Sequence, residues 1–450
     1  MTIVNKREPI LLLLGDIIFF YISLWCMLAI RYIAYPEKAL IDSHLLPFSI
    51  LFFIWVVVFY IAGLYEKHTI FLRNKLPTTI LNTQIINSLV AVLFFYLVPF
   101  FGITPKTNLF IYLIVSFGLI VVWRLFLFPK LFFSKRKYGA VLIGSGEELQ
   151  ELKREVNENE RYGFTFIQSI DVQDLSSIDF KKDVIDIMYE GQVQLCVIDM
   201  KDPAIQPVVS QLYNLIFSGV QFIDKHKVYE GIFDKIPLSI IGYSWFIENI
   251  SSKTRMVYDT FKRLTDIVLA SFVGIAWIVI TPFVLLAIWI EDGGNAFIVQ
   301  ERVGQGGKKF KLLKFRSMTT NNNRGGWPGE EGEQNKITRV GNFLRKSRID
   351  ELPQVWNVFK GDMSLIGPRP DIIGNYETLV KEVPYYTIRN LVKPGLSGWA
   401  QTHQEVVPHT IEETKERLAY DIFYIKNRSL FLDAKIALQT VKTLAGRVGR

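Results

Sequence analysis

The residues best suited to chemistry are two adjacent carboxylates, Asp350 and Glu351, which stand between two groups of cations. Downstream, the turn Gly367-Pro368-Arg369-Pro370 supplies one of these cations. An ionised carboxylate beside an arginine-bound phosphate is a credible covalent nucleophile for phosphoryl transfer. The pattern therefore indicates a phosphoryl-transfer site as one interpretation. The upstream cations are Arg345, Lys346 and Arg348.

The local sequence also allows a purely structural role for this pair. Asp is favoured at helix N-caps and proline is tolerated in the first turn, so Asp350 can cap a helix that Leu352 and Pro353 begin. The helix dipole and the neighbouring arginines would then keep Asp350 ionised. A capped helix with solvated ion pairs needs no function, because surface ion pairs contribute little. The pair alone leaves both interpretations open.

Six sequence blocks around the carboxylate pair favour the functional interpretation. The blocks are Lys314-Phe315-Arg316-Ser317-Met318, Ile337-Thr338-Arg339-Val340-Gly341, Asp350-Glu351-Leu352-Pro353-Gln354, residues 361–370, residues 394–401 and Tyr420-Asp421-Ile422-Phe423-Tyr424. Their residues and order resemble those of the bacterial sugar transferases, also called polyprenyl-phosphate hexose-1-phosphate transferases or monotopic phosphoglycosyl transferases. The resemblance is detailed from Tyr258 to the C-terminus, and the large chain is similar to undecaprenyl-phosphate glucose or galactose phosphotransferases.

The resemblance implies roles residue by residue. It implies Asp350 as the catalytic nucleophile and Glu351 as its partner in a dyad. It also implies a magnesium ion, Mg2+, at Asp350 and Glu351, because two phosphates need a hard cation. For Lys314 and Arg316, contact with lipid headgroups or plain solvation is the alternative to phosphate binding. The residues expected to bind phosphate or substrate are Lys314, Arg316, Arg345, Arg369 and Asp421.

The implied reaction transfers a sugar 1-phosphate from a UDP-sugar to undecaprenyl phosphate. Asp350 would form a covalent phosphosugar-aspartyl intermediate, and the products would be UMP and a polyprenyl-diphosphate-sugar. In the resembled family this step begins the assembly of an exopolysaccharide, a capsule or an O-antigen. UDP-glucose or UDP-galactose is the expected donor for a chain of this size, although the spacing of residues does not reveal the sugar.

The composition indicates a membrane protein of two or three domains. Half of the 450 residues are hydrophobic, the mean hydropathy is +0.24 and the formal net charge is +8. This balance suits anionic lipid or phosphate-bearing substrates, and no nucleic-acid-binding motif is recognised. Four apolar runs have spanning length and predict a four-helix transmembrane bundle within residues 1–136. The runs are Ile10 to Ile30, Leu45 to Tyr65, Ile80 to Phe101 and Leu109 to Phe128.

The basic residues that flank these runs predict the orientation. Nine lie on one side and three on the other, so both ends of the bundle should face the cytoplasm of a bacterial inner membrane. Within the first run, Asp16 is either a functional intramembrane acid or a partner for a neighbouring helix. Arg124 is expected to reach the cytosolic headgroups. The nine are Lys6, Arg7, Lys67, Arg73, Lys75, Lys130, Lys135, Arg136 and Lys137, and the three are Arg31, Lys38 and Lys106.

Residues 137–245 read as a Rossmann-like α/β domain. A strand at 140–143 leads into a glycine turn at 144–146, and later strands are expected at 164–170, 193–198 and 220–223. Leu149 replaces the third glycine of a dinucleotide-binding turn, and two glutamates occupy the start of the helix, where a pyrophosphate would sit. No cofactor-binding residue is therefore assigned. A structural or regulatory module, or one that forms a homodimer, is the favoured interpretation.

Residues 246–450 should form an α+β catalytic domain that begins with a fifth apolar segment, 267–290. Thr281-Pro282 interrupts this segment, and basic residues flank it on both sides. These features favour a re-entrant helix that enters and leaves the membrane on one face, with a kinked complete span as the alternative. In the resembled family the break occurs at Ser-Pro, so the threonine is a mild departure.

Two other functions remain open. A membrane-anchored nucleotide-sugar dehydratase or epimerase that uses NAD would share the spans and the α/β domain. Tyr258 and Lys262 match the Tyr-x-x-x-Lys spacing of short-chain dehydrogenases, but they lie beside a membrane segment and far from the glycine turn. The third possibility is a non-catalytic membrane scaffold, which the retention of every expected catalytic acid and base disfavours.

Overall fold

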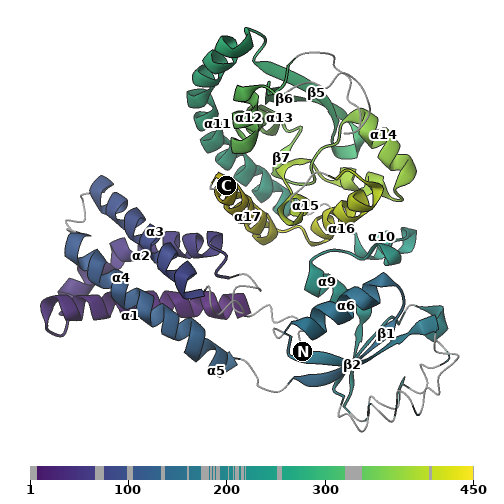
Figure 1. Cartoon of the computed structure of the whole chain (residues 1–450), viewed down its shortest axis with the longest axis horizontal. Coiled ribbons are helices and arrows are strands. Elements are labelled where there is room, and N and C mark those ends of the chain that lie inside the picture. The colour runs from purple at the N-terminus through teal and green to yellow at the C-terminus, as the bar shows by residue number, and fades with distance from the viewer. Residues whose placement is uncertain are drawn as a thin grey trace. The chain divides into compact units, whose positions relative to one another are not determined.

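The computed structural model divides into two compact units, Met1–Ile232 and Phe233–Arg450, and each is described by itself (Figure 1). The second unit begins before residue 245, because Ile236 and Trp245 pack in one core with Leu379 and Ile422. The residues described are 8–65, 76–98, 105–132, 137–159, 162–173, 182, 185, 188, 193–200, 202–205, 207, 212–213, 217, 219–250, 256–319, 337–404 and 408–448.

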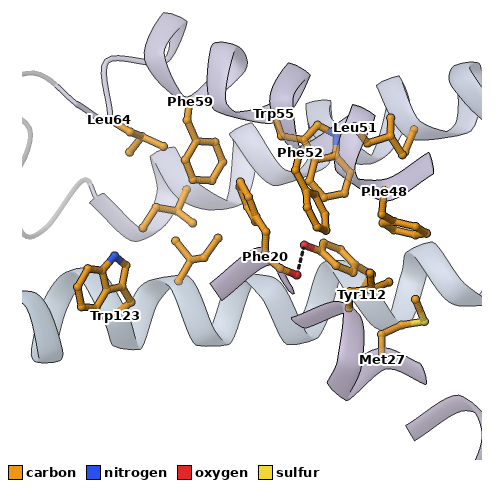
Figure 2. Packing of buried hydrophobic residues seen from close by; sticks show 14 of the residues in the cluster. Phe20, Met27, Phe48, Leu51, Phe52, Trp55, Phe59, Leu64, Tyr112 and Trp123 are labelled. Atoms are coloured by element: carbon orange, nitrogen blue, oxygen red, sulfur yellow. Dashed lines mark hydrogen bonds between the residues drawn. The ribbon is translucent and has the colours of Figure 1, made fainter. Parts of the chain in front are cut away.

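Four long apolar helices open the first unit, as the hydropathy pattern predicts. Each is long and apolar enough to cross a membrane. They bury a shared core rich in aromatic rings, in which Phe20, Phe52 and Trp55 pack together and the Tyr112 hydroxyl donates a hydrogen bond of 3.1 Å to the Phe20 carbonyl oxygen (Figure 2). The helices are α1 (Glu8–Tyr32), α2 (Lys38–Ile61), α3 (Leu76–Leu97) and α4 (Pro105–Val122). Seven of the nine basic residues used to predict the orientation lie outside the described residues: Lys6, Arg7, Lys67, Arg73, Lys75, Lys135 and Arg136.

A buried ion pair joins the first and fourth of these helices. Helix α4 continues through a π-helical turn, Trp123–Leu127, into α5, Phe128–Phe132. In that turn Arg124 is only 3% exposed; its Nε donates to Asp16 Oδ1 at 3.1 Å and its Nη1 donates to the Leu64 carbonyl oxygen at 2.7 Å. The expectation that Arg124 reaches the headgroups is therefore wrong. Asp16 instead has a partner on a neighbouring helical segment, which was one of its two predicted roles.

A parallel four-stranded sheet follows, as predicted, with the order β2-β1-β3-β4. Its strands are β1 (Tyr138–Gly144), β2 (Phe164–Asp171), β3 (Leu195–Ile198) and β4 (Gln221–Asp224), and α6 (Glu147–Glu158) follows β1. The strand order reverses between β1 and β3: β2 lies on one side of β1, and β3 and β4 lie on the other. Sheets of this type usually bind ligands at such a point. Here Lys225, the first residue of α9 (Lys225–Phe233), lies over Gly144, and its Nζ donates to the Ser145 carbonyl oxygen at 3.2 Å.

The second unit mixes short strands with helices. Strands β5 (Phe297–Val303) and β6 (Lys309–Phe315) form an antiparallel hairpin. Strands β7 (Ser364–Ile366) and β8 (Gly395–Ser397) form a parallel pair. The helices are α10 (Tyr243–Asn249), α11 (Met256–Asp292), α12 (Arg339–Ser347), α13 (Val355–Lys360), α14 (Ile373–Glu382), α15 (Trp399–His403), α16 (Ile411–Asn427) and α17 (Leu430–Val448).

The fifth apolar segment forms helix α11, whose 37 residues run through Thr281 and Pro282 without interruption. One face of this helix packs on the second unit through Ala270, while large apolar side chains such as Phe272 and Phe283 are exposed. Both ends are attached to the same unit. Near the start, Arg263 Nη1 donates to the Val358 carbonyl oxygen at 2.7 Å. At the other end, the Glu291 carboxylate accepts from the first backbone N–H groups of α12 at 2.6 and 3.1 Å.

Candidate active site

Asp350 and Glu351 lie in a tight 3-10 turn, Ile349–Gln354, which follows α12. Arg348 separates the two helical segments and has a left-handed backbone, with φ of +59°. Because this residue begins the turn, Asp350 lies inside it, and the prediction that Asp350 is an N-cap is wrong. Residues other than glycine adopt this left-handed backbone conformation at a cost of about 1–2 kcal/mol. The chain thus holds a strained residue two positions before Asp350.

Glu351 collects three cations on one oxygen. Its Oε1 accepts a hydrogen bond of 2.8 Å from Arg369 Nη2 and one of 3.3 Å from Lys314 Nζ, and Arg348 Nη1 lies at 3.6 Å. Burial alone would raise the pKa of Glu351, but Arg369 and Lys314 hold that pKa well below its usual range. Glu351 is therefore ionised, and it organises the cations predicted to bind phosphate.

Asp350 differs from its neighbour in having an open oxygen. It is 7% exposed, and its Oδ1 is buried without a hydrogen-bond partner among the described residues. Burial, and then the charge of Glu351, raise the pKa of Asp350, while Lys314 and Arg348 oppose that shift. The sequence argument expected the cations and the helix dipole to keep Asp350 ionised, and burial acts in the opposite direction. A carboxylate with a raised pKa is more basic and is a stronger nucleophile once ionised.

The turn that carries Arg369 is held by close backbone contacts. Strands β7 and β8 approach so closely that a Cβ on Gly395 would lie 2.1 Å from the Gly367 backbone nitrogen. Arg389 and Arg417 each donate a hydrogen bond of 2.9 Å to the Arg369 carbonyl oxygen. These contacts explain why the blocks 361–370 and 394–401 contain glycine where their backbones meet. They fix the place from which Arg369 reaches Glu351.

Asp421 lies behind this turn and does not contact the carboxylate pair. It is 1% exposed, and it accepts a hydrogen bond of 2.7 Å from Arg389 Nε. Its link to the site therefore runs through Arg389 and the Arg369 backbone. The structure gives Asp421 a place in the support of the site, and its predicted contact with substrate stays untested.

Arg316 and Arg345 lie at the margin of the cluster. Arg316 is buried, and its guanidinium lies against Gly294, where a Cβ would be 2.1 Å from Nη1. Arg345 is exposed on α12 but is close enough to help lower the pKa of Asp350 against the larger effect of burial. The structure thus brings Lys314 and Arg369 directly to Glu351, with Arg345 near Asp350 and Arg316 against Gly294.

Several functional candidates were missed by the sequence argument. Arg302 belongs to the basic stretch that follows the fifth apolar segment, but it was given no role. Arg389 and Arg417 support Arg369, and no sequence pattern marked them. Their signal is a buried charge, which becomes visible only once the fold brings them together.

The described residues include no group of three or more His, Cys, Asp or Glu side chains that could hold a metal ion. The adjacent pair Asp350 and Glu351 remains, with one open oxygen on Asp350. Magnesium is commonly held by one or two protein carboxylates together with substrate phosphates, so this donor set fits such an ion.

Comparison with known proteins places the second unit in a family. The family model for "Bacterial sugar transferase" matches residues 257–447, which contain every residue of the cluster. A UDP-glucose:undecaprenyl-phosphate glucose-1-phosphate transferase from Caulobacter vibrioides is 38% identical over 191 residues, which cover 42% of this chain and 72% of that protein. The chain belongs to the bacterial sugar transferase family. Its resemblance to that family, inferred above from six blocks, is thereby confirmed.

Two further bacterial sugar transferases extend the comparison. A UDP-galactose-lipid carrier transferase from Erwinia amylovora is 30% identical over 341 residues, or 70% of this chain and 69% of that protein. A UDP-N-acetylgalactosamine-undecaprenyl-phosphate N-acetylgalactosaminephosphotransferase from Aeromonas hydrophila is 40% identical over 191 residues, which cover 42% of this chain and 44% of that protein. The Erwinia match is longer than the catalytic region alone. The three names differ in the sugar, so similarity at this level does not select one.

Proposed function

We propose that this chain transfers a sugar 1-phosphate from a UDP-sugar to undecaprenyl phosphate and releases UMP. UDP-glucose or UDP-galactose is the proposed donor, and the product is the polyprenyl-diphosphate-sugar that begins an exopolysaccharide, capsule or O-antigen unit. The relatives named above support the substrate classes. The observation that carries the proposal is the buried Oδ1 of Asp350, which has no hydrogen-bond partner among the described residues and lies beside a carboxylate that binds Lys314 and Arg369.

The proposed reaction has two steps, the formation and the breakdown of a covalent intermediate on Asp350. An ionised Asp350 oxygen attacks the β-phosphorus of the UDP-sugar, the bond to the bridging oxygen breaks, and its electron pair leaves with UMP. An oxygen of the lipid phosphate then attacks the same phosphorus and returns the electron pair to Asp350. Lys314 and Arg369 stabilise the charge on the phosphoryl oxygens, and Glu351 keeps both cations in place before the reaction starts.

Asp350 and Glu351 are also the proposed magnesium ligands, together with substrate phosphate oxygens. The unpartnered Oδ1 of Asp350 supports this assignment. A bound magnesium ion would supply positive charge to the phosphate oxygens.

The proposed membrane arrangement is a four-helix transmembrane bundle followed by a re-entrant α11, in the bacterial inner membrane, with the other parts of the chain facing the cytoplasm. A helix of 37 residues is about 55 Å long, whereas the hydrocarbon core is about 30 Å thick. Contacts from both ends of α11 to the same compact unit are difficult to reconcile with a complete crossing, because that unit cannot lie on both sides. They support return of the chain to one face at Thr281 and Pro282.

The division 1–136, 137–245 and 246–450 stays a proposal in three parts, with the middle domain as a homodimer contact, although Ile236 and Trp245 pack in the core of the third part. An NAD-dependent function is not favoured. The Tyr258 hydroxyl and Lys262 Nζ both donate to Asp433 Oδ2, at 2.8 and 3.2 Å, so the pair serves to anchor α11 to α17.

The test is release of UMP by the purified full chain with magnesium and undecaprenyl phosphate, over a panel of UDP-glucose, UDP-galactose and UDP-N-acetylgalactosamine. We expect lipid-dependent turnover with one donor and parallel lines in a double-reciprocal plot, as two-step covalent chemistry requires. Intersecting lines, which indicate that both substrates must be bound together, would contradict the mechanism. Tight stoichiometric binding of NAD would favour the dehydratase or epimerase instead.

A further inference from the structure

Arg302 is a cation at the edge of the site that none of the assignments above uses. It lies near the end of β5, and this strand is joined to the segment that follows Arg369. The backbone nitrogen of Val303 donates to the Asp371 carbonyl oxygen at 3.1 Å, and Arg302 forms an antiparallel bridge with Ile372. The fold therefore fixes Arg302 next to the turn that presents Arg369.

The guanidinium of Arg302 is only partly satisfied. Its Nη1 donates to the Pro370 carbonyl oxygen at 3.1 Å and its Nη2 donates to Gln300 Oε1 at 2.7 Å. Both acceptors are neutral. Its Nε is buried and has no hydrogen-bond partner among the described residues. A buried N–H of a charged group is costly when it has no hydrogen-bond partner, so the geometry favours an added acceptor for Nε.

The surrounding charge points to an anion as that acceptor. Burial, and then the neighbouring charge of Arg369, lower the pKa of Arg302 to about 10, against the smaller opposing effects of Asp371 and Glu351. Lys314 has a lowered pKa for related reasons, since burial, Arg369 and Arg302 all act against its charge. Arg302, Lys314 and Arg369 thus repel one another, and an incoming phosphate would relieve that repulsion.

The position of Arg302 separates it from the nucleophile. The charges that affect the pKa of Asp350, after burial, are those of Glu351, Lys314, Arg348 and Arg345. The contacts of Arg302 are instead with Gln300, the Pro370 carbonyl oxygen and the backbone of Ile372. Arg302 therefore adjoins the segment that follows Arg369, and not the turn that carries Asp350. In phosphoryl transfer the attacking and leaving oxygens are roughly in line, so the leaving group departs on the side opposite the nucleophile.

We propose that Arg302 binds the phosphate of the departing nucleotide, UMP, through its free Nε–H and its charge. This assignment rests on the proposed transferase function. When the bond between the β-phosphorus and the bridging oxygen breaks, the electron pair moves onto the phosphate of UMP, and Arg302 stabilises that added charge. Arg302 takes no part in the second step, in which the lipid phosphate attacks the intermediate after UMP has left.

The experiment measures UMP binding by the full chain in detergent with magnesium, and compares wild type with Arg302→Gln, Arg302→Lys and Lys311→Gln. Lys311 is an exposed cation on β6, so its replacement makes the same change of charge outside the site. Loss of a charge-assisted hydrogen bond should weaken UMP binding by about 10-fold to 100-fold in Arg302→Gln. Arg302→Lys should fall between that variant and wild type, and Lys311→Gln should bind as wild type does.

A second readout separates leaving-group binding from a merely structural role. The intermediate is formed without lipid, freed of UMP, and then mixed with undecaprenyl phosphate. We expect this second step to proceed at the wild-type rate in both Arg302 variants. Unchanged UMP binding in Arg302→Gln would overturn the assignment, as would equal losses in UMP binding and in the lipid step. A wild-type protein that neither binds UMP nor releases it from any donor would instead overturn the proposed function itself.

Discussion

Replacement of Gly395 by alanine tests whether the close contact between β7 and β8 positions Arg369. The added Cβ would lie 2.1 Å from the Gly367 backbone nitrogen, whereas ordinary contact begins at 3.4 Å, so the two segments must separate by about 1.3 Å. The three nearest atoms belong to the backbone of Ile366 and Gly367, so they cannot rotate away. The same displacement at Arg369 would lengthen its 2.8 Å hydrogen bond to Glu351 beyond hydrogen-bonding distance.

The expected result in Gly395→Ala is a large loss of turnover, accompanied by a measurable loss of stability. A misplacement of about 1 Å in a catalytic group can cost about 100-fold in rate, while overpacking costs about 1–3 kcal/mol of stability. Both are measured on detergent-purified protein, by UMP release and by thermal unfolding. Gly242→Ala is the matched control, because a Cβ there meets nothing within 4 Å and φ is −152°. Turnover in Gly395→Ala equal to that of the control would refute the reasoning.

Three further predictions address the backbone, the pH dependence and the membrane helices. Arg348→Gly should be more stable than Arg348→Ala by about 1 kcal/mol in thermal unfolding, since both lose the charge but only glycine relieves the left-handed strain; equal stability would argue against strain. Asp350 must be deprotonated to attack, so the rate of UMP release should rise with pH through its raised pKa. Glu351→Gln removes a charge that, after burial, raises this pKa, and the acidic limb of the remaining activity should move to lower pH; movement to higher pH would contradict the assignment. Asp16→Leu should destabilise the chain by about 3–5 kcal/mol, because it leaves Arg124 buried and unpaired. The double replacement Asp16→Leu/Arg124→Leu should recover most of that loss. A double variant no more stable than the single one would refute the pairing.

Much of the fold could be predicted from sequence because its signals are local. Long apolar runs mark the membrane-length helices, and short β-branched runs after turns mark the parallel strands. The helix boundaries are less certain: α2 begins at Lys38 and not at Leu45, since its first turns are polar and carry no hydropathy signal. The sequence also did not show that α11 continues as one helix through Thr281 and Pro282. A proline inside an apolar segment is compatible with a kinked helix and with a helix that ends there.

The site was only partly predictable because its essential contacts join distant residues. The blocks identify Asp350, Glu351 and Arg369, but the role of Arg302 depends on a bridge between β5 and Ile372. Arg124 was misplaced for the same reason, since its partner Asp16 lies 108 residues away. The cap at Asp350 was misread because nothing in the residue type marks Arg348 as left-handed.

The most direct test of the central claim is a search for the covalent intermediate on Asp350. The purified chain would be incubated with magnesium and the active UDP-sugar in the absence of lipid, digested and examined by mass spectrometry. The account predicts a sugar-phosphate adduct on the peptide that contains Asp350, its disappearance when undecaprenyl phosphate is added, and its absence in Asp350→Asn. An adduct on another residue, or wild-type UMP release by Asp350→Asn, would contradict the account.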